Sequence, residues 1–420
     1  MHSKSRRDFL KATGAAAAAT TWTARSYASI LGSNDRLGVA IIGCGNMGSS
    51  HLKSVLGLRE TENIELRAIC DVWMTRATRF GDIAKLAGAQ PVVTQDYREV
   101  LAMEDVDYVV LPLPNHWHAP MTLEALDAGK HVYVEKPMTY SIREAHAVVK
   151  KANETGLKVQ TGVQAMSDDS YSSAWEAIRA GTLGQLIHAQ TDYVRWYPGD
   201  KGLWRTGEPA GQPKPDDLDW SMWQKHAPRQ VPYSSLIYHD WRCYRDYSGG
   251  ISTDLFIHRI TRIIKACNLA FPVRAVGMGG VFMWPDGRTL PDNFEMIAEY
   301  PAQEGITRGM TVHVLGTMAN DHGIEHCIRG HKATLIFTPG GWRIVAQDGR
   351  KELQAHQKTG AEDVNLHHKN LQAAIRENVP LNTPPELGMY GVIACNMANI
   401  SYFDKTMAAY DPEKGDVASA

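Results

Sequence analysis

Apolar and polar positions follow two different rhythms along the chain. In the first half, short apolar runs alternate with amphipathic stretches of helical length, which is typical of parallel strands joined by helices. Ser141, with Glu144 three residues later, forms a capping box that begins a helix over 141–155. This half is therefore predicted to be an α/β domain built on a doubly wound parallel sheet. Its expected strands are 37–42, 64–70, 92–93, 106–113, 131–134 and 159–163.

The pattern changes after residue 160. Alternating strands with turns between them predict an α+β domain with an open, mostly antiparallel sheet, and amphipathic helices end the chain. The expected domains are 29–160 and 161–420. One open face of such a sheet needs covering, so we expect a homo-oligomer. The expected elements are helices 171–180, 365–376 and 388–401 and strands 186–194, 275–282, 294–300, 310–316, 324–330 and 333–338.

The first 28 residues have the pattern of an export signal. Ser5-Arg6-Arg7-Asp8-Phe9-Leu10-Lys11 is a twin-arginine pattern, followed by a weakly apolar stretch and the small-residue site Ser26-Tyr27-Ala28. The alternative is a disordered basic tail. We predict export by the twin-arginine route to the periplasm. No later run has ~18 uninterrupted apolar residues, so no membrane span is expected.

Charge and cysteine content narrow the function further. The net charge is -2, which gives no reason to expect a nucleic-acid partner. Six cysteines occur, none in a C-x-x-C pair, and no Cys/His cluster has zinc spacing. We therefore predict no metal site.

A glycine motif follows the first strand. Gly43-Cys44-Gly45-Asn46-Met47-Gly48 is G-x-G-x-x-G between a strand and a helix. Gly43 suits the tight turn, Gly45 lets the backbone approach a pyrophosphate, and Gly48 allows close packing of helix and strand. The alternative is a tight turn without ligand. The motif predicts a dinucleotide site that includes Asn46 and Met47.

Asp71 ends the second strand, where a carboxylate can accept hydrogen bonds from an adenosine ribose. This favours NAD. Arg76 and Arg79 follow within two turns and can accommodate the extra phosphate of NADP, so NADP stays possible.

Two further places carry candidate acid–base chemistry. Glu135-Lys136-Pro137 ends the fifth strand, at the edge where open α/β sheets bind ligands. Asp254 and His258 are four residues apart on a predicted helix, so the carboxylate can orient the ring and stabilise its protonated form. The alternatives are a solvated ion pair and a helix-start hydrogen bond.

Residues 195–248 are rich in aromatic side chains and punctuated by proline and glycine. Long irregular insertions of this kind are usually functional. Flat aromatic faces suit sugar rings, and neighbouring polar groups suit their hydroxyls. The alternative is that the aromatics pack the insertion onto its own domain or another subunit. The predicted substrate residues are Trp204, Arg205, Tyr238, His239, Trp241 and Arg242.

Four motifs in order resemble the Gfo/Idh/MocA oxidoreductases, the glucose-fructose oxidoreductase and inositol dehydrogenase family. They are the glycine turn, Pro114-Asn115-His116-Trp117-His118, Glu135-Lys136-Pro137 and the element from Gly249 through Asp254 to His258. The elements Leu218-Asp219-Trp220, Trp223 and Trp241-Arg242 resemble its exported bacterial branch.

The resemblance implies a Rossmann domain, bound nicotinamide cofactor and a sugar or cyclitol substrate. It implies that Lys136 is a catalytic acid/base that contacts cofactor and substrate, that Asp254 and His258 share the catalysis, and that other motif residues contact the cofactor. Phe256 and Thr261 depart from residues common in the family, so the substrate cannot be transferred. The implied cofactor contacts are Pro114, Asn115, His118 and Glu135.

Three functions remain open. The first is an NAD(P)-dependent sugar or polyol dehydrogenase. The second is a redox-assisted glycoside hydrolase or lyase, and the third a non-catalytic NAD-binding sugar sensor. Glycosidases of the family lack the lysine of the third motif, so Lys136 favours the dehydrogenase. Because free nicotinamide cofactor is scarce outside the cytoplasm, a tightly bound NAD that is recycled in place is expected.

Overall fold

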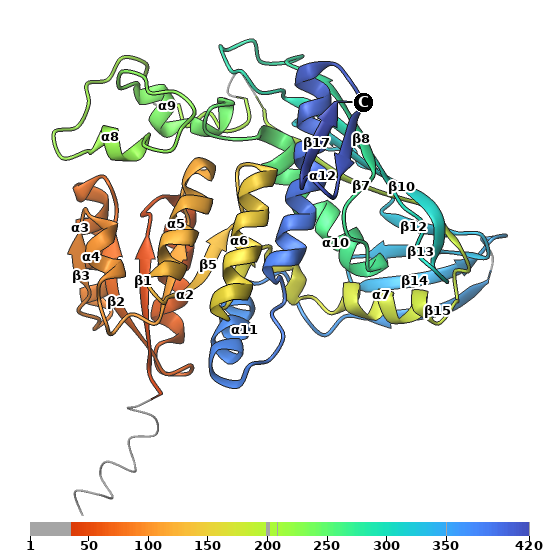
Figure 1. The fold of residues 1–420 in the computed structure, drawn as a ribbon, viewed down its shortest axis with the longest axis horizontal. Helices are drawn as coiled ribbons and strands as arrows, with labels where there is room; N and C mark the ends of the chain where they lie inside the picture. Colours follow the sequence, from red (N-terminus) through yellow and green to blue (C-terminus); the bar gives the residue numbers. More distant parts are fainter. Residues whose placement is uncertain (1–34, 199–201, 208, 350, 420) are drawn as a thin grey trace, which may run out of the picture.

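The computed structural model describes residues 35–419 except 199–201, 208 and 350. Its first half is a parallel sheet of six strands in the order β3-β2-β1-β4-β5-β6, flanked by helices (Figure 1). The predicted doubly wound sheet is confirmed. Its elements are β1 Leu37–Ile42, α2 Asn46–Leu58, β2 Ile64–Cys70, α3 Met74–Leu86, β3 Val92–Thr94, α4 Tyr97–Leu101, β4 Tyr108–Leu111, α5 Asn115–Asp127, β5 His131–Glu135, α6 Ile142–Thr155 and β6 Val159–Gly162.

The second half is built on a larger mixed sheet. Along it the strands run β15-β14-β13-β12-β7-β10-β9-β8-β16-β17, and all of these neighbours are antiparallel except β7 and β10. The mostly antiparallel sheet is thus confirmed; the domain limits stay a prediction. Its strands are β7 Leu186–Trp196, β8 Arg274–Gly280, β9 Asn293–Tyr300, β10 Thr307–Thr317, β12 Cys327–Gly330, β13 Ala333–Thr338, β14 Gly341–Ala346, β15 Glu352–Gln357, β16 Ala408–Asp411 and β17 Asp416–Ser419, with β11 Ala319–Asn320 beside β7.

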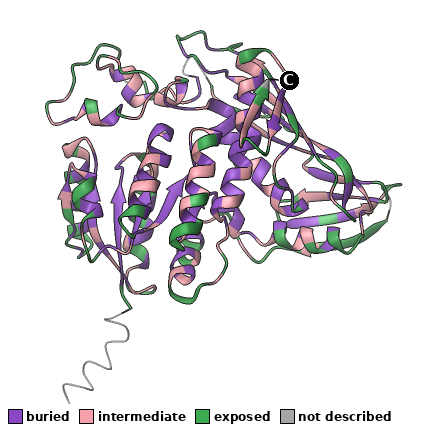
Figure 2. Cartoon of the chain, in the orientation of Figure 1, coloured by how far each residue is buried: buried purple, intermediate pink, exposed green. Residues whose placement is uncertain are grey.

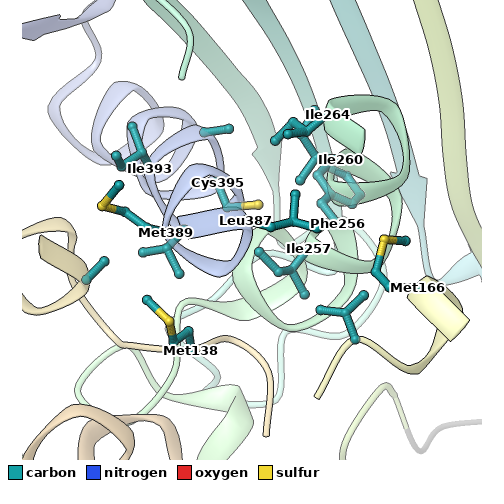
Figure 3. Close-up of a cluster of buried hydrophobic side chains, with 14 of the residues drawn as sticks. Met138, Met166, Phe256, Ile257, Ile260, Ile264, Leu387, Met389, Ile393 and Cys395 are labelled. Atoms are coloured by element: carbon teal, nitrogen blue, oxygen red, sulfur yellow. The ribbon is translucent and has the colours of Figure 1, made fainter. Parts of the chain in front are cut away.

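Helices lie between the two sheets and join the halves. α7 (Ser170–Arg179), α10 (Ile257–Cys267) and α12 (Pro385–Asp404) pack on the second sheet, and α11 (Val364–Glu377) packs on the first half. Ile257 and Ile260 of α10 meet Leu387 of α12, and Met138 approaches from the loop after β5 (Figure 3). This continuous apolar core, buried along α12 (Figure 2), fixes α10 relative to the end of β5.

Residues 202–248, with Glu208 outside the described part, form a segment that we call the aromatic cap. It contains α8 (Trp220–Trp223) and α9 (Ser235–His239) and lies over the carboxyl ends of the parallel strands (Figure 1). Trp220 and Trp223 stack with ring centroids 4.7 Å apart. Together with Leu218, Tyr238 and Tyr247 they form a hydrophobic cluster separate from the main core.

Several large apolar side chains on or next to the second sheet are exposed. Met278 on β8 is 74% exposed and Ile297 on β9 is 45% exposed, and Phe282 follows β8. We expect these side chains to be covered by a second copy of the chain, as apolar patches on oligomeric proteins are. Light scattering should report a wild-type mass above that of one subunit. In the double variant Met278→Arg/Ile297→Arg, the mass should fall toward that of one subunit. Leu86→Arg, at an exposed position in the first half, should leave the mass unchanged. A monomeric wild-type protein would contradict this expectation.

In the part of the chain that the structure describes, no helix is long and apolar enough to cross a membrane.

Candidate functional site

A cavity of about 870 Å³ lies between the carboxyl edge of the parallel sheet and the aromatic cap. It brings together twelve of the predicted site residues. Gly48, Asn115, His118, Asp254, His258, Trp204 and Arg205 do not line it. The twelve that do are Gly43, Gly45, Asn46, Met47, Asp71, Pro114, Glu135, Lys136, Tyr238, His239, Trp241 and Arg242.

The glycine turn fits a pyrophosphate. Gly43 has φ 114°, a conformation that side chains disfavour. No atom lies within 4 Å of where a Cβ on Gly45 would stand, so this backbone borders open space in the cavity. Gly45 also caps α2 without a side-chain hydrogen bond, which leaves the first amides of the helix available to an anion.

Gly48 is needed for packing. A Cβ there would stand 2.2 Å from the Gly43 carbonyl oxygen, whereas a Cβ on Gly57 of the same helix would meet nothing within 4 Å. We expect Gly48→Ala to weaken NAD binding at least ~10-fold by moving α2 away from the turn. Gly57→Ala should bind NAD normally and unfold at the same or a higher temperature. Titration calorimetry and thermal unfolding measure both; equal NAD affinities would contradict this account of the turn.

Asp71 is buried beside the glycine turn. Its carboxylate accepts hydrogen bonds from the Cys44 N–H (2.7 Å) and the Trp73 N–H (2.8 Å). Burial raises the pKa of Asp71, although these bonds and the nearby Arg76 act in the opposite sense. The Arg76 guanidinium also borders the cavity, 4.9 Å from the Trp73 ring centroid. Either nucleotide therefore meets both an acid and an arginine here, and the preference for NAD stays a prediction.

The aromatic cap is fastened to the nucleotide side of the cavity. Asp217 accepts hydrogen bonds from the Trp73 indole (3.0 Å) and from the Thr75 N–H (2.7 Å), just beyond Asp71. The Trp223 carbonyl accepts the Trp117 indole N–H at 2.7 Å and lies 2.8 Å from His116 Nε2. Burial lowers the pKa of His116 to about 4, so this ring is neutral and donates from Nε2.

Lys136 reaches from the first half to the beginning of helix α10. Its ammonium donates to the Asp254 carbonyl at 2.8 Å and lies 3.4 Å from Asp254 Oδ1. Arg242 Nε lies 3.2 Å from the same oxygen. Burial lowers the pKa of Lys136 and the charge of Asp254 opposes that shift. An ammonium with a lowered pKa at the edge of a cavity is suited to acid–base chemistry.

The other oxygen of Asp254 is also occupied. Oδ2 accepts hydrogen bonds from Ser248 (2.7 Å) and Asn115 (3.0 Å). Burial alone would raise the pKa of Asp254, but the Lys136 and Arg242 charges, with these two bonds, hold it below its usual value. Asn115 is therefore placed to fix Asp254 rather than a cofactor.

The structure does not show Asp254 orienting the His258 ring, as the sequence predicted; their shared role in catalysis stays a prediction. Residues Ser252–Phe256 form a π-helical turn, and both oxygens of Asp254 are occupied by other groups. No hydrogen bond joins Asp254 and His258 in the described structure, and His258 Nδ1 is buried without a hydrogen-bond partner. Burial, followed by the charge of Lys136, lowers the pKa of His258 well below its ordinary value. The ring is therefore a neutral base rather than a stabilised imidazolium.

Glu135 and His118 lie beneath the cavity as supports. Glu135 Oε1 lies 3.0 Å from His51 Nε2 and accepts the Gln164 amide at 2.8 Å. Both ring nitrogens of His118 face backbone carbonyls, those of Pro137 and Leu113. Glu135 still borders the cavity, whereas His118 is fully buried and can act on a cofactor only by fixing the loops around Lys136.

Arg205 and Trp204 need correction as substrate residues. The Arg205 guanidinium bonds Asp286 at 2.8 Å and Asp240 at 3.2 Å, and it also bonds the Asp286 carbonyl. Its donors are thus used to tie the aromatic cap to the loop between β8 and β9. Trp204 packs against the main core. Neither borders the cavity, so neither is placed to meet a sugar there.

Sequence reasoning missed several groups of this site. Trp117 and Met121 of α5, and Thr206, Met222 and Trp223 of the aromatic cap, also line the cavity. Trp117 and Trp223 lie within motifs noted in the sequence, and their aromatic side chains could have marked them as cavity-lining residues. The Trp223 carbonyl anchor has no sequence signal, because a backbone oxygen is the same in every residue.

Metal-binding clusters are absent from the described chain: no three His, Cys, Asp or Glu side chains are placed to hold a metal ion.

Comparison with family models agrees with the fold of the first half. Residues 37–163 match the model described as "Oxidoreductase family, NAD-binding Rossmann fold". Residues 5–21, which lie outside the described part of the structure, match a twin-arginine translocation signal sequence, which indicates export.

Curated relatives carry glycosidase names. A "Glycosyl hydrolase family 109 protein" from Shewanella baltica is 32% identical over 240 residues, 49% of this chain and 51% of the relative. An "Alpha-N-acetylgalactosaminidase" from Shewanella oneidensis is 31% identical over 240 residues, with the same coverage. The match thus spans about half the length of each protein.

Solved structures support the whole fold. A levoglucosan dehydrogenase in complex with NADH and levoglucosan has a TM-score of 0.66 at 16% identity, covering 89% of this chain and 99% of that one. An oxidoreductase domain protein from Kribbella flavida has a TM-score of 0.67 at 18% identity, covering 90% and 99%. At these identities the likeness concerns the fold alone.

Proposed function

The chain belongs to the Gfo/Idh/MocA oxidoreductase family and carries a twin-arginine signal, and from this premise we propose that it cleaves glycosides in the periplasm by a redox-assisted, NAD-dependent route. This reverses the preference that Lys136 gave to a net dehydrogenase. The relatives named as glycosyl hydrolases support the reversal.

One structural observation carries the proposal. The aromatic cap is fastened over the nucleotide side of the cavity, at Trp73 and Thr75 through Asp217 and at Trp117 through the Trp223 carbonyl. A nucleotide held beneath such a cap exchanges slowly, because these contacts must open first. In an exported protein, a retained NAD favours a reaction that restores the cofactor in each cycle. Glycoside cleavage is redox-neutral, whereas a dehydrogenase needs a second redox partner.

The residues that would hold NAD are those of the glycine turn, with Asp71 at the ribose end and Lys136 toward the nicotinamide end. Bound NAD would supply reversible hydride acceptance, which converts a ring carbinol into a carbonyl. The carbonyl makes the neighbouring C–H acidic, so that this carbon can lose a proton and the aglycone can leave as an alcohol. After water adds, return of the hydride restores the carbinol.

The protein moves the protons. The Lys136 ammonium, held by Asp254, hydrogen-bonds the carbinol oxygen and relays its proton: it passes one proton to His258 and takes the carbinol proton as hydride leaves, and the relay runs backwards when the carbonyl is reduced. His258 is kept neutral by burial and nearby cations, which suits it to receive that proton from Lys136 although its ring does not border the cavity. The Trp241 ring, covered by Arg242 at 4.1 Å, and the Tyr238 and Trp223 rings give the cavity flat apolar walls for a sugar. Positioned proton transfer contributes roughly 10²–10⁴-fold.

An assay separates the possible functions. Purified mature protein is incubated with aryl glycosides and with free sugars, with and without added NAD. We expect aglycone release without net NADH, and no requirement for added NAD if the cofactor is retained. Net NADH formation from free sugars would instead identify a dehydrogenase, and bound nucleotide without either activity would identify a sensor.

A further inference from the structure

A second cavity of about 290 Å³ lies between α7, α10 and the second sheet. We call it the arginine pocket. It has no lining residue in common with the cavity beneath the aromatic cap. Its charged and polar lining includes Tyr171, Arg259, Arg262, His326, Lys358 and Glu362.

Arg259 in this pocket lacks a carboxylate partner. Its Nε is buried without any hydrogen bond, and no ion pair to it is found in the described chain. Its guanidinium carbon lies 5.0 Å from the centroid of the Tyr193 ring, and the negative charge of Asp192 opposes the lowering of its pKa without forming an ion pair. Burial, followed by the charge of Arg262, lowers the pKa of Arg259. A half-buried arginine without an anion is costly, so its retention beside a cavity indicates a missing partner.

The acids around the pocket already have partners. Glu362 pairs with Arg262 at 2.9 Å and Asp168 pairs with Lys358 at 3.4 Å. Asp192 behind them accepts a hydrogen bond from the Ile324 N–H and lies 3.0 Å from His326 Nε2. These contacts leave the Arg259 fork as the group still able to bind an oxyanion with two parallel hydrogen bonds.

The arginine pocket lies next to the proposed catalytic cluster. Arg259 follows His258 directly on α10, and Glu362 Oε1 lies 4.0 Å from His258 Nδ1. The Tyr193 ring contacts both neighbours, with its centroid 6.2 Å from that of His258. The arginine pocket therefore adjoins His258, with the Tyr193 ring beside both His258 and Arg259.

We propose that the arginine pocket binds the oxyanion group of an acidic glycoside: a sugar carboxylate, a sulfate ester or a phosphate ester. This inference rests on the proposed function for the reacting ring, but the pocket itself is defined by Arg259 and its neighbours.

Binding tests the pocket without turnover. The purified mature protein is titrated calorimetrically with glucuronate, glucose, galactose 6-sulfate, inorganic sulfate and inorganic phosphate. We expect a sugar acid or sugar sulfate to bind at least ~10-fold more weakly to Arg259→Met than to wild type. Arg343→Met, whose exposed cation lies on β14 outside the pocket, should bind as wild type does. Because Arg259 has no carboxylate partner, its loss leaves no unpaired acid, and an unchanged unfolding temperature checks the fold.

The other calorimetric outcomes would refute the acidic-glycoside site. Equal affinities for Arg259→Met and wild type, or no binding of any probe, would remove the site. Inorganic sulfate or phosphate binding that depends on Arg259, without binding of the sugar acids, would make the ligand a free anion and refute the acidic glycoside.

Kinetics separate this inference from the proposed function. If the protein cleaves aryl glycosides, Arg259→Met should raise KM for an aryl uronide or a sulfated aryl glycoside at least ~10-fold and change kcat less than twofold, while neutral aryl glycosides are unaffected. Cleavage of neutral glycosides alone, unaffected by Arg259→Met, would refute the inference and leave the proposed function standing. No cleavage of any glycoside would refute the proposed function, and the calorimetric result would still decide the pocket.

Discussion

Replacing Lys136 with methionine should reduce turnover by at least ~10³-fold while leaving NAD bound. The side chain keeps its length, so the packing around β5 is retained, but the ammonium that lies beside Asp254 Oδ1 is lost. Asp254 still accepts hydrogen bonds from Arg242, Ser248 and Asn115. Its buried carboxylate therefore keeps hydrogen-bond partners, and the fold is retained.

Single-turnover and steady-state rates with an aryl glycoside, together with nucleotide content by absorbance, check this result. Lys151→Met provides a control, because Lys151 is a surface residue of α6 paired with Asp127. It should have wild-type activity. Activity of Lys136→Met within tenfold of wild type would remove Lys136 from the chemistry.

Replacing Asp254 with asparagine should lower kcat by on the order of 10² and move the alkaline limb of the pH–rate profile to lower pH. Asparagine keeps the shape but turns one acceptor into a donor, which then faces Lys136 or Ser248. The direction of this shift follows from the negative charge of Asp254. Burial already lowers the pKa of Lys136, and the negative charge of Asp254 opposes that shift. Without that charge the pKa falls further, so the ammonium is lost at a lower pH.

The pH–rate profile of kcat/KM for Asp254→Asn and wild type measures both effects. Asp246→Asn removes a carboxylate from a surface pair with Arg229 and should keep the wild-type profile. An alkaline limb that stays in place in Asp254→Asn would mean that the limb does not report Lys136. Full activity would mean that Asp254 does not position it.

The first half could be predicted closely because its signals are local. β1 and β2 have the predicted limits, since buried parallel strands read as uninterrupted apolar runs between turns. The capping box of Ser141 and Glu144 is present, with both side-chain bonds formed. The glycine turn was equally predictable, because Gly43 adopts a backbone conformation that few other residues allow and Gly48 leaves no room for a Cβ.

The arrangement of the site could not be predicted in the same way. The spacing of Asp254 and His258 predicted one helix face, but the Asp254 oxygens are bonded instead by side chains that include Lys136 and Asn115, which are distant along the chain. Arg205 looked free in sequence, whereas its partners Asp240 and Asp286 are distant along the chain. The fastening of the aromatic cap depends on tertiary contacts and on a backbone carbonyl, neither of which has a local pattern.

β14 and β15 were missed for a related reason. Their hairpin lies at one edge of the second sheet, where exposed positions carry polar and charged residues and the apolar alternation is weak. Trp342 and Ile344 are buried from one face, but β15 is almost wholly exposed. Pairing with β13, rather than propensity, makes this edge a sheet.

The central claim is that the protein cleaves a glycoside through transient oxidation of its ring with retained NAD. The most direct measurement is the cleavage of an aryl glycoside in D₂O without added cofactor, with the sugar product analysed by NMR and the nucleotide by absorbance. The account predicts aglycone release, deuterium at the carbon between the oxidised carbinol and the anomeric carbon, and no net NADH. Aglycone release without deuterium at that carbon, or an oxidised sugar accompanied by equivalent NADH, would contradict it.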